Sequence, residues 1–137
     1  MPDAASGPGT TDPHQLGAAV DRLSSSTRKA SAAAFAVAAV TLDDGEIVQL
    51  AMGCRFLGAD GAVVLTDRQM LITNARPWQP DVVPVALEPG LTVQGWQDDR
   101  SAALVFARSG HELVVDQISD RAIAQELAAE VRRRTEG

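Results

Sequence analysis

After about residue 45, the apolar residues occur in short runs that turn-forming residues separate. Two such runs, at 63–65 and 70–72, flank the polar stretch 66–68, which predicts a β-hairpin over residues 62–74. The same pattern predicts further strands at 46–56, 82–87, 91–97, 102–108 and 112–116, which makes about seven short strands in all. Because Pro84 has no N–H to donate, the strand 82–87 is expected at an edge of the sheet.

After residue 116 the period of the apolar positions changes from two to helical. Apolar side chains recur on one helix face, and the last turn carries three arginines where the helix dipole favours positive charge. The apolar stripe is Ile118, Ala122, Ile123, Leu127 and Val131, and the arginines are Arg132, Arg133 and Arg134. This pattern predicts a C-terminal amphipathic helix.

A second amphipathic helix is predicted near the N-terminus. Leu16, Val20 and Leu23 follow one another at spacings of four and three residues. Asp12 is a suitable N-cap, and Pro13 suits the first helical position. The apolar face of this helix can dock on its own domain, on a second copy of the chain, or in a groove of a partner. We expect docking on the chain itself or homo-oligomerisation.

The alanine-rich stretch 27–40 fits two structures, because alanine favours a helix whereas Phe35 and Val37 would also suit a strand. We favour the helix. Residues 1–12 are rich in Pro, Gly, Ser, Thr and Asp, a mixture that cannot bury enough surface to fold. The expected organisation is a disordered tail at 1–12, an N-terminal helical segment at 13–40 and a β-rich domain at 41–137.

The composition is that of an ordinary soluble protein, with 45% hydrophobic and 22% charged residues and a mean hydropathy of -0.02. A net charge of -6 and a pI near 4.7 argue against nucleic-acid binding, which needs a basic surface. A single cysteine cannot form an internal disulfide. We therefore expect a cytoplasmic protein, with a position at the inner face of the membrane as the alternative.

Residues suited to chemistry are few and scattered. A zinc site needs several Cys or His ligands, and this chain has only Cys54, His14 and His111. Cys54 in an apolar strand is expected to be a small buried hydrophobe, and His111 a solvated turn residue. No nucleophile, base and orienting group can be assembled from the sequence. We expect no enzymatic activity, no catalytic residue, no metal and no cofactor.

Two motifs resemble bacterial pleckstrin-homology-like domains. The stretch Asp-Asp-Gly-Glu-Ile-Val at 43–48 is similar to the "GE" start of a strand in those domains. The stretch 61–72 is similar to their Gly-x-hydrophobic-Thr-Asp-Arg-x-hydrophobic hairpin. The resemblance covers about residues 27–134. It implies a mainly β fold with helices: a partly open barrel of about seven antiparallel strands, capped by a C-terminal α-helix and preceded by a helical extension.

The resemblance also implies a binding scaffold without catalytic machinery, used for proteins, peptides or lipid headgroups. Phosphoinositide-binding relatives carry several Lys and Arg in the loop after the first strand. Here the matching stretch 53–61 has only Arg55, alongside Asp60, and so departs from the headgroup-binding pattern. Within the hairpin corner, Asp67 and Arg68 are expected to form a turn with a local ion pair.

Two tryptophans are candidate interaction residues. Trp78 lies near Arg76 in the proline-containing loop 75–81, and it is either a lid over the barrel or an exposed contact residue. We favour the lid, because large apolar side chains are seldom left bare. Trp96 falls on the polar face of its strand, where it is expected to cover the N-terminal helix, unless a bulge at Gly95 re-aims it.

The sequence thus predicts a non-enzymatic interaction module. In the first hypothesis, the loops around Trp78 and the open sheet edge near Pro84 hold a protein or peptide, and the N-terminal amphipathic helix supports self-assembly. The alternative is a peripheral membrane or lipid-binding protein that acts through the basic ends of the alanine-rich helix and the C-terminal helix.

Overall fold

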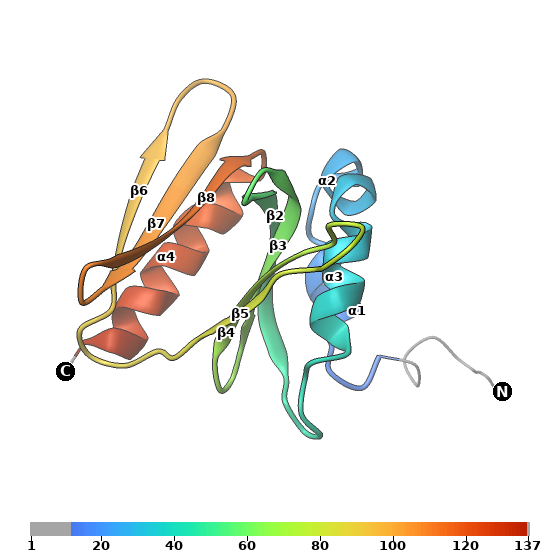
Figure 1. Cartoon of the computed structure of the whole chain (residues 1–137), viewed down its shortest axis with the longest axis horizontal. Helices are drawn as coiled ribbons and strands as arrows, with labels where there is room; N and C mark the ends of the chain where they lie inside the picture. The colour runs from blue at the N-terminus through green and yellow to red at the C-terminus, as the bar shows by residue number, and fades with distance from the viewer. Residues whose placement is uncertain (1–11, 137) are drawn as a thin grey trace, which may run out of the picture.

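The strand pattern and the helical pattern of the sequence become one antiparallel sheet with helices on both of its sides (Figure 1). The structure is a computed structural model that describes residues 12–136. Its elements are α1 (Leu16–Val20), α2 (Ser25–Ala30), α3 (Ala32–Ala39), β2 (Val48–Phe56), β3 (Ala59–Thr66), β4 (Met70–Asn74), β5 (Val82–Val85), β6 (Thr92–Gln97), β7 (Ala102–Arg108), β8 (His111–Ile118) and α4 (Arg121–Thr135).

The seven strands lie in the order β5-β4-β3-β2-β8-β7-β6, and every neighbouring pair is antiparallel. The predicted seven strands, terminal helix and N-terminal helices are confirmed. The strands do not close into a β-barrel, because the sheet is open and β5 and β6 are its two edges. Pro84 lies in β5, so the predicted edge strand is confirmed.

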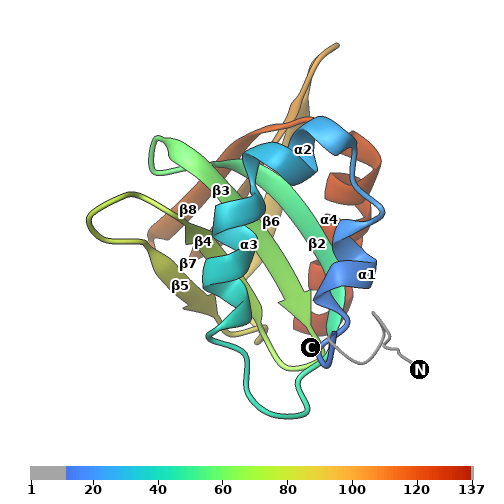
Figure 2. The ribbon, with the colours of Figure 1, turned by 90° about the vertical axis from the view of Figure 1, so that its right-hand side faces the viewer.

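Helices cover the first half of the sheet on both faces. The short helices α1, α2 and α3 lie on one side of β2, β3 and β4, and α4 lies on the other side of the sheet (Figures 1 and 2). This is why β4 and most of β2 and β3 are buried on both faces instead of alternating between buried and exposed. The stretch 27–40 is helical as favoured, and the helices belong to the same hydrophobic core as the strands.

The N-terminal amphipathic helix docks on its own domain. Leu23 is buried, and Leu16 and Val20 are partly buried against the common core. Of the three alternatives for this apolar face, docking on the chain itself therefore holds. The helix begins later than predicted, at Leu16. Asp12 still caps it from a distance, because its carboxylate accepts hydrogen bonds from the backbone N–H groups of Gly17 and Ala18.

Gly53 sets how closely α2 approaches the sheet. A Cβ atom at this position in β2 would lie 2.3 Å from Thr27 Cγ2 and 2.7 Å from Ser31 Oγ, which is closer than side chains can pack. Two buried hydrogen bonds fix the same layer: Ser31 Oγ donates to Gly61 O at 2.9 Å, and Thr73 Oγ1 donates to Ala34 O at 2.8 Å. The helical segment is therefore joined to the sheet by apolar packing and by polar contacts.

The corner between β3 and β4 is built around a fully buried carboxylate, that of Glu46. Its Oε2 accepts hydrogen bonds from Thr66 Oγ1 at 2.6 Å and from Gln69 Nε2 at 3.1 Å, and its Oε1 accepts one from Asp43 N at 3.0 Å. Burial alone would raise the pKa of Glu46, but these hydrogen bonds and the nearby Arg68 charge outweigh burial and hold the pKa below its ordinary value.

The predicted ion pair between Asp67 and Arg68 is wrong. Asp67 Oδ1 instead accepts the backbone N–H of Ile47, and the Arg68 guanidinium donates to the carbonyl of Asp44. Both side chains therefore connect the corner to the segment before β2. The two stretches that carry the family resemblance meet here, and their polar residues serve the fold.

Candidate functional site: a groove between β6 and α4

β6 is the last strand of the sheet, so no strand among residues 12–136 pairs with its outer edge. In an antiparallel strand, the N–H and C=O groups of one residue point to the same side of the strand. Successive residues alternate between the two sides. Asp98 N donates to Ser101 O, which directs the even-numbered positions of the hairpin toward β7. Val93 O instead accepts a hydrogen bond from the α4 side chain Arg132 and so points outward. By this parity, the backbone groups of Gly95 and Gln97 also point outward, along the free edge.

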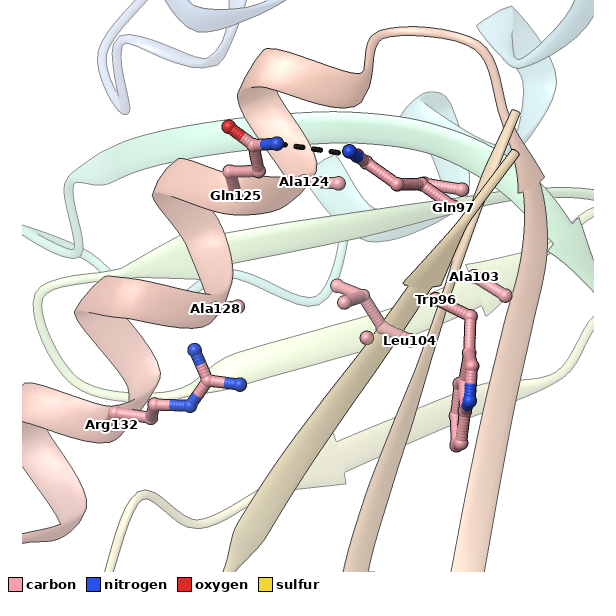
Figure 3. A pocket seen from close by; sticks show the side chains of 10 residues that line it. Trp96, Gln97, Ala103, Leu104, Ala124, Gln125, Ala128 and Arg132 are labelled. Atoms are coloured by element: carbon pink, nitrogen blue, oxygen red, sulfur yellow. Dashed lines mark hydrogen bonds between the residues drawn. The ribbon is translucent and has the colours of Figure 1, made fainter. Parts of the chain in front are cut away.

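A groove lies beside this edge, between β6 and α4 (Figure 3). Its volume is about 350 Å³, and small residues make room for it: Gly95 on the strand and Ala124 and Ala128 on the helix. Leu104 of β7 adds an apolar floor. A Cβ atom at Gly95 would lie 3.1 Å from Leu104 Cδ2, so the missing side chain is what keeps the groove open.

Polar side chains stand at the two ends of the groove. Arg132 donates from Nη2 to Val93 O at 3.1 Å, and Gln125 Nε2 donates to Gln97 Oε1 at 3.2 Å (Figure 3). Arg132 is exposed and forms no ion pair with any residue in the described part of the chain. The site therefore combines an apolar hollow, a row of backbone hydrogen-bonding groups and an uncompensated positive charge.

Residues with reactive side chains lie elsewhere. Cys54 is buried as expected, and burial, with smaller contributions from Asp116 and Asp60, raises the pKa of its thiol to about 12, so it stays protonated and inert. His111 is exposed at the start of β8, in the hairpin turn predicted for it. Between residues 12 and 136, no group of three or more His, Cys, Asp or Glu side chains could hold a metal ion.

The lid interpretation of Trp78 is wrong, because this side chain is 98% exposed. The loop holds its shape without the tryptophan: Arg76 Nε lies 2.8 Å from Asp81 Oδ2, and Asn74 Nδ2 donates to the same Asp81 oxygen. With the loop braced by polar contacts, nothing draws the indole inward. Leu57, in the neighbouring β2–β3 turn, is also 58% exposed.

We expect Trp78 to behave in solution as a fully hydrated tryptophan. In a Trp96→Phe variant, which leaves Trp78 as the single reporter, emission should be red-shifted, and iodide should quench it nearly as strongly as in the urea-unfolded protein. Fluorescence titration with potassium iodide measures this, with potassium chloride as the ionic-strength control. A blue-shifted, poorly quenched signal would restore the lid.

Trp96 lies on the polar face of its strand, as the alternation predicted, and is 57% exposed. Its side chain is on the side of β6 away from α4 (Figure 3). The expectation that it covers the N-terminal helix is wrong, because β6 is at the opposite end of the molecule from α1 (Figure 1). Sequence reasoning named Gly95 as a bulge candidate but missed that it opens a groove with Ala124 and Ala128.

The basic end of α4 is used within the molecule. Arg133 and Arg134 both pair with Glu130, whose pKa falls to about 2 because it accepts hydrogen bonds from both guanidinium groups. Arg134 also donates to Thr66 O and to the Gln49 side chain. No helix in the described range 12–136 is both long and apolar enough to cross a membrane.

A pleckstrin homology domain from Shewanella amazonensis SB2B, known from its crystal structure, is similar to this chain. The TM-score is 0.51 with 19% sequence identity, over 70% of this chain and 92% of that one. No family model matches the sequence, and no curated protein matches it. The chain thus has a pleckstrin-homology-like fold, as its two motifs indicated. At this level of identity the likeness concerns the fold, so the ligand has to be argued from the surface of this chain.

Proposed function

We propose that the protein is a binding module that takes an extended peptide segment of another protein as an added strand along β6. The observation that carries the proposal is the free edge of β6 beside an open groove. The outward backbone groups of Gly95 and Gln97 would pair with the backbone of the peptide. Such pairing supplies affinity without regard to sequence, and pockets for alternate side chains add specificity.

The groove favours a particular kind of peptide. Side chains alternate along an added strand, so one of them would be directed toward α4, into the hollow at Gly95. The hollow has an apolar lining of Leu104, Ala124 and Ala128, which suits an aliphatic or aromatic side chain. Arg132, without an ion-pair partner in the described part of the chain, suits an acidic residue further along the peptide.

Two observations support a non-enzymatic protein-binding role over the lipid-binding alternative. Pleckstrin-homology-like folds are in general binding scaffolds without catalytic machinery. Arg133 and Arg134 at the end of α4 both pair with Glu130, which offsets part of the positive charge that anionic lipid would need there. The exposed pair Leu57 and Trp78 is a second candidate surface for a protein contact.

The proposal is tested by selecting binders from a library of random dodecapeptides displayed on phage and measuring their affinity by calorimetry. Gly95→Val fills the hollow and should weaken the selected peptides by about tenfold or more. The matched control is Gln94→Val, which places the same side chain on the other face of the same strand. Thermal unfolding of both variants verifies that they are folded.

Backbone pairing has its own signature. Bound peptide should slow hydrogen exchange at the amides of Gly95 and Gln97 by giving them acceptors, and should leave the even-numbered amides of β6 unchanged. A library that yields no binder, or binders that tolerate Gly95→Val and do not protect these two amides, would contradict the proposed function.

A further inference from the structure

The outer face of the strands β6, β7 and β8 has no covering layer among the described residues. The N-terminal helices cover the outer face of β2, β3 and β4 on the other half of the sheet, whereas α4 packs on the inner side of β6 and β7 (Figure 1). On the uncovered face, Trp96 is 57% exposed and Val114 is 48% exposed. Large apolar side chains on a bare sheet face indicate a contact surface.

The register of the strands arranges these side chains in rows. Trp96 of β6 pairs with Ala103 of β7, and Val105 of β7 pairs with Val114 of β8. Side chains at paired positions lie on the same face of the sheet. Trp96, Ala103, Val105 and Val114 therefore form a continuous apolar band across three strands. In this subsection, the outer face means the face of β6, β7 and β8 that carries this band.

A hollow of about 300 Å³ lies at the Trp96 end of the band. Its lining includes Trp96, Asp98, Ala103 and Asp116, which brings an aromatic residue and two acidic residues together around a small one. Figure 3 shows Trp96 and Ala103 directed to the same side, away from α4. An aromatic ring beside carboxylates is an arrangement that attracts a cation.

Neither carboxylate has an ion-pair partner in the described part of the chain. Asp98 Oδ1 accepts the backbone N–H groups of Arg100 and Ser101, which fixes the side chain at the hairpin turn. Arg121 donates to the main-chain carbonyl of Asp98. The side chain of Asp98 is left with its second oxygen free of such contacts.

Asp116 lies opposite Arg55 of the neighbouring strand β2. The guanidinium of Arg55 nevertheless forms an ion pair with Asp60 at 3.4 Å and donates a hydrogen bond to Gly58 O at 2.6 Å. Glu112, exposed on the same face of β8, adds a further negative charge beyond Val114. The outer face thus presents apolar side chains flanked by acidic ones.

We propose that the outer face binds a basic-apolar segment of a partner protein, with an arginine or lysine side chain of that segment in the hollow between Trp96, Asp98 and Asp116. The Val105 and Val114 side chains contact apolar residues beside that cation. Negative charge at the rim repels anionic lipid and nucleic acid, so a polypeptide with Lys or Arg next to apolar residues is the occupant that fits. The surface lies on the other side of β6 from the groove, and this proposal does not depend on the peptide proposed there.

The test uses Trp96 as its own reporter, in a Trp78→Phe background. N-acetyl-arginine amide should change the Trp96 emission in a saturable manner, and N-acetyl-citrulline amide, which has nearly the same shape without the charge, should bind at least about fivefold more weakly. Asp116→Asn should weaken arginine binding by about fivefold. Asp99→Asn, which removes one negative charge from the β6–β7 turn outside the hollow, is the matched control and should leave binding unchanged.

The apolar part of the proposal has a separate readout. The blocked peptide Leu-Arg-Leu should bind more tightly than Ser-Arg-Ser, and Val114→Ser should remove that difference while the response to arginine amide remains. Equal binding of arginine and citrulline, equal effects of Asp116→Asn and Asp99→Asn, or no saturable response would overturn the proposal. So would an emission change that follows protein concentration alone, because the occupant would then be a second copy of the chain.

Discussion

A chain that begins at Thr41, and so lacks the N-terminal helices, is expected to lose its cooperative unfolding transition. Removing α1, α2 and α3 would bare the outer face of β2, β3 and β4, strands that are buried on both faces in the complete fold. Loss of Leu23 and Phe35 burial alone removes about 1.5–3 kcal/mol each. Two buried hydrogen bonds, from Ser31 to Gly61 and from Thr73 to Ala34, are lost as well.

These losses compare with a total stability of roughly 5–15 kcal/mol for a domain of this size. The truncated chain should therefore give no sharp transition in thermal unfolding by near-UV circular dichroism, and it should aggregate during size-exclusion chromatography. The matched control is a chain that begins at Asp12, which keeps all three helices and should unfold cooperatively. If the chain from Thr41 unfolded as sharply as the control, the division at residue 41 would mark an independent domain, and the helices would be an appendage.

The elements that sequence reasoning predicted well are those that a local pattern determines. The hairpin of β3 and β4 follows from two apolar runs around a polar corner, and the edge position of β5 follows from the missing N–H of Pro84. The polar turn at Asp98 is also local, since its carboxylate bonds residues two and three positions further on. Such features need no knowledge of which distant segments meet.

The candidate sites could not be predicted in this way, because they depend on small residues that the fold brings together from distant segments. The groove at β6 exists because Gly95 faces two alanines of α4, and neither part of the sequence marks the other. Trp78 is exposed for a related reason. The general tendency of tryptophan to be buried does not hold in a loop that Asn74, Arg76 and Asp81 fix by polar contacts.

The two family motifs are a third case. The sequence shows both motifs, but it does not show that their polar residues contact each other. Glu46 and Thr66 are distant in the sequence and belong to the two separate motifs of the resemblance. In the fold they share a hydrogen bond of 2.6 Å, and Thr66 Oγ1 also accepts the backbone N–H groups of Arg68 and Gln69. The motif therefore describes one buried polar cluster that fixes the β3–β4 corner against the start of β2, which accounts for its polar residues without a ligand.

Glu46→Ala is accordingly expected to destabilise the protein by about 3 kcal/mol or more. The carboxylate accepts hydrogen bonds from a buried donor on Thr66 and from partly buried donors on Asp43 and Gln69. A donor left unsatisfied in a buried site costs about 1–3 kcal/mol, and the packing of the Glu46 side chain is lost as well. Urea unfolding followed by circular dichroism measures the loss. Glu88→Ala, at an exposed position in the β5–β6 connection, serves as the control and should change stability little.

The same carboxylate makes part of the stability depend on pH. Because the pKa of Glu46 is lower in the folded protein than its ordinary value of 4.5, the unfolded chain binds the proton more readily. The contribution is therefore present above the ordinary pKa and is lost as the pH falls through the folded pKa. Other carboxylates titrate in this range too, so the informative quantity is the stability difference between the wild type and Glu46→Gln, which cannot ionise. That difference should be largest near neutral pH and should shrink as the pH falls below 4.5. A difference independent of pH would mean that the pKa of Glu46 is the same in the folded and unfolded protein, and the opposite trend would mean that folding raises it.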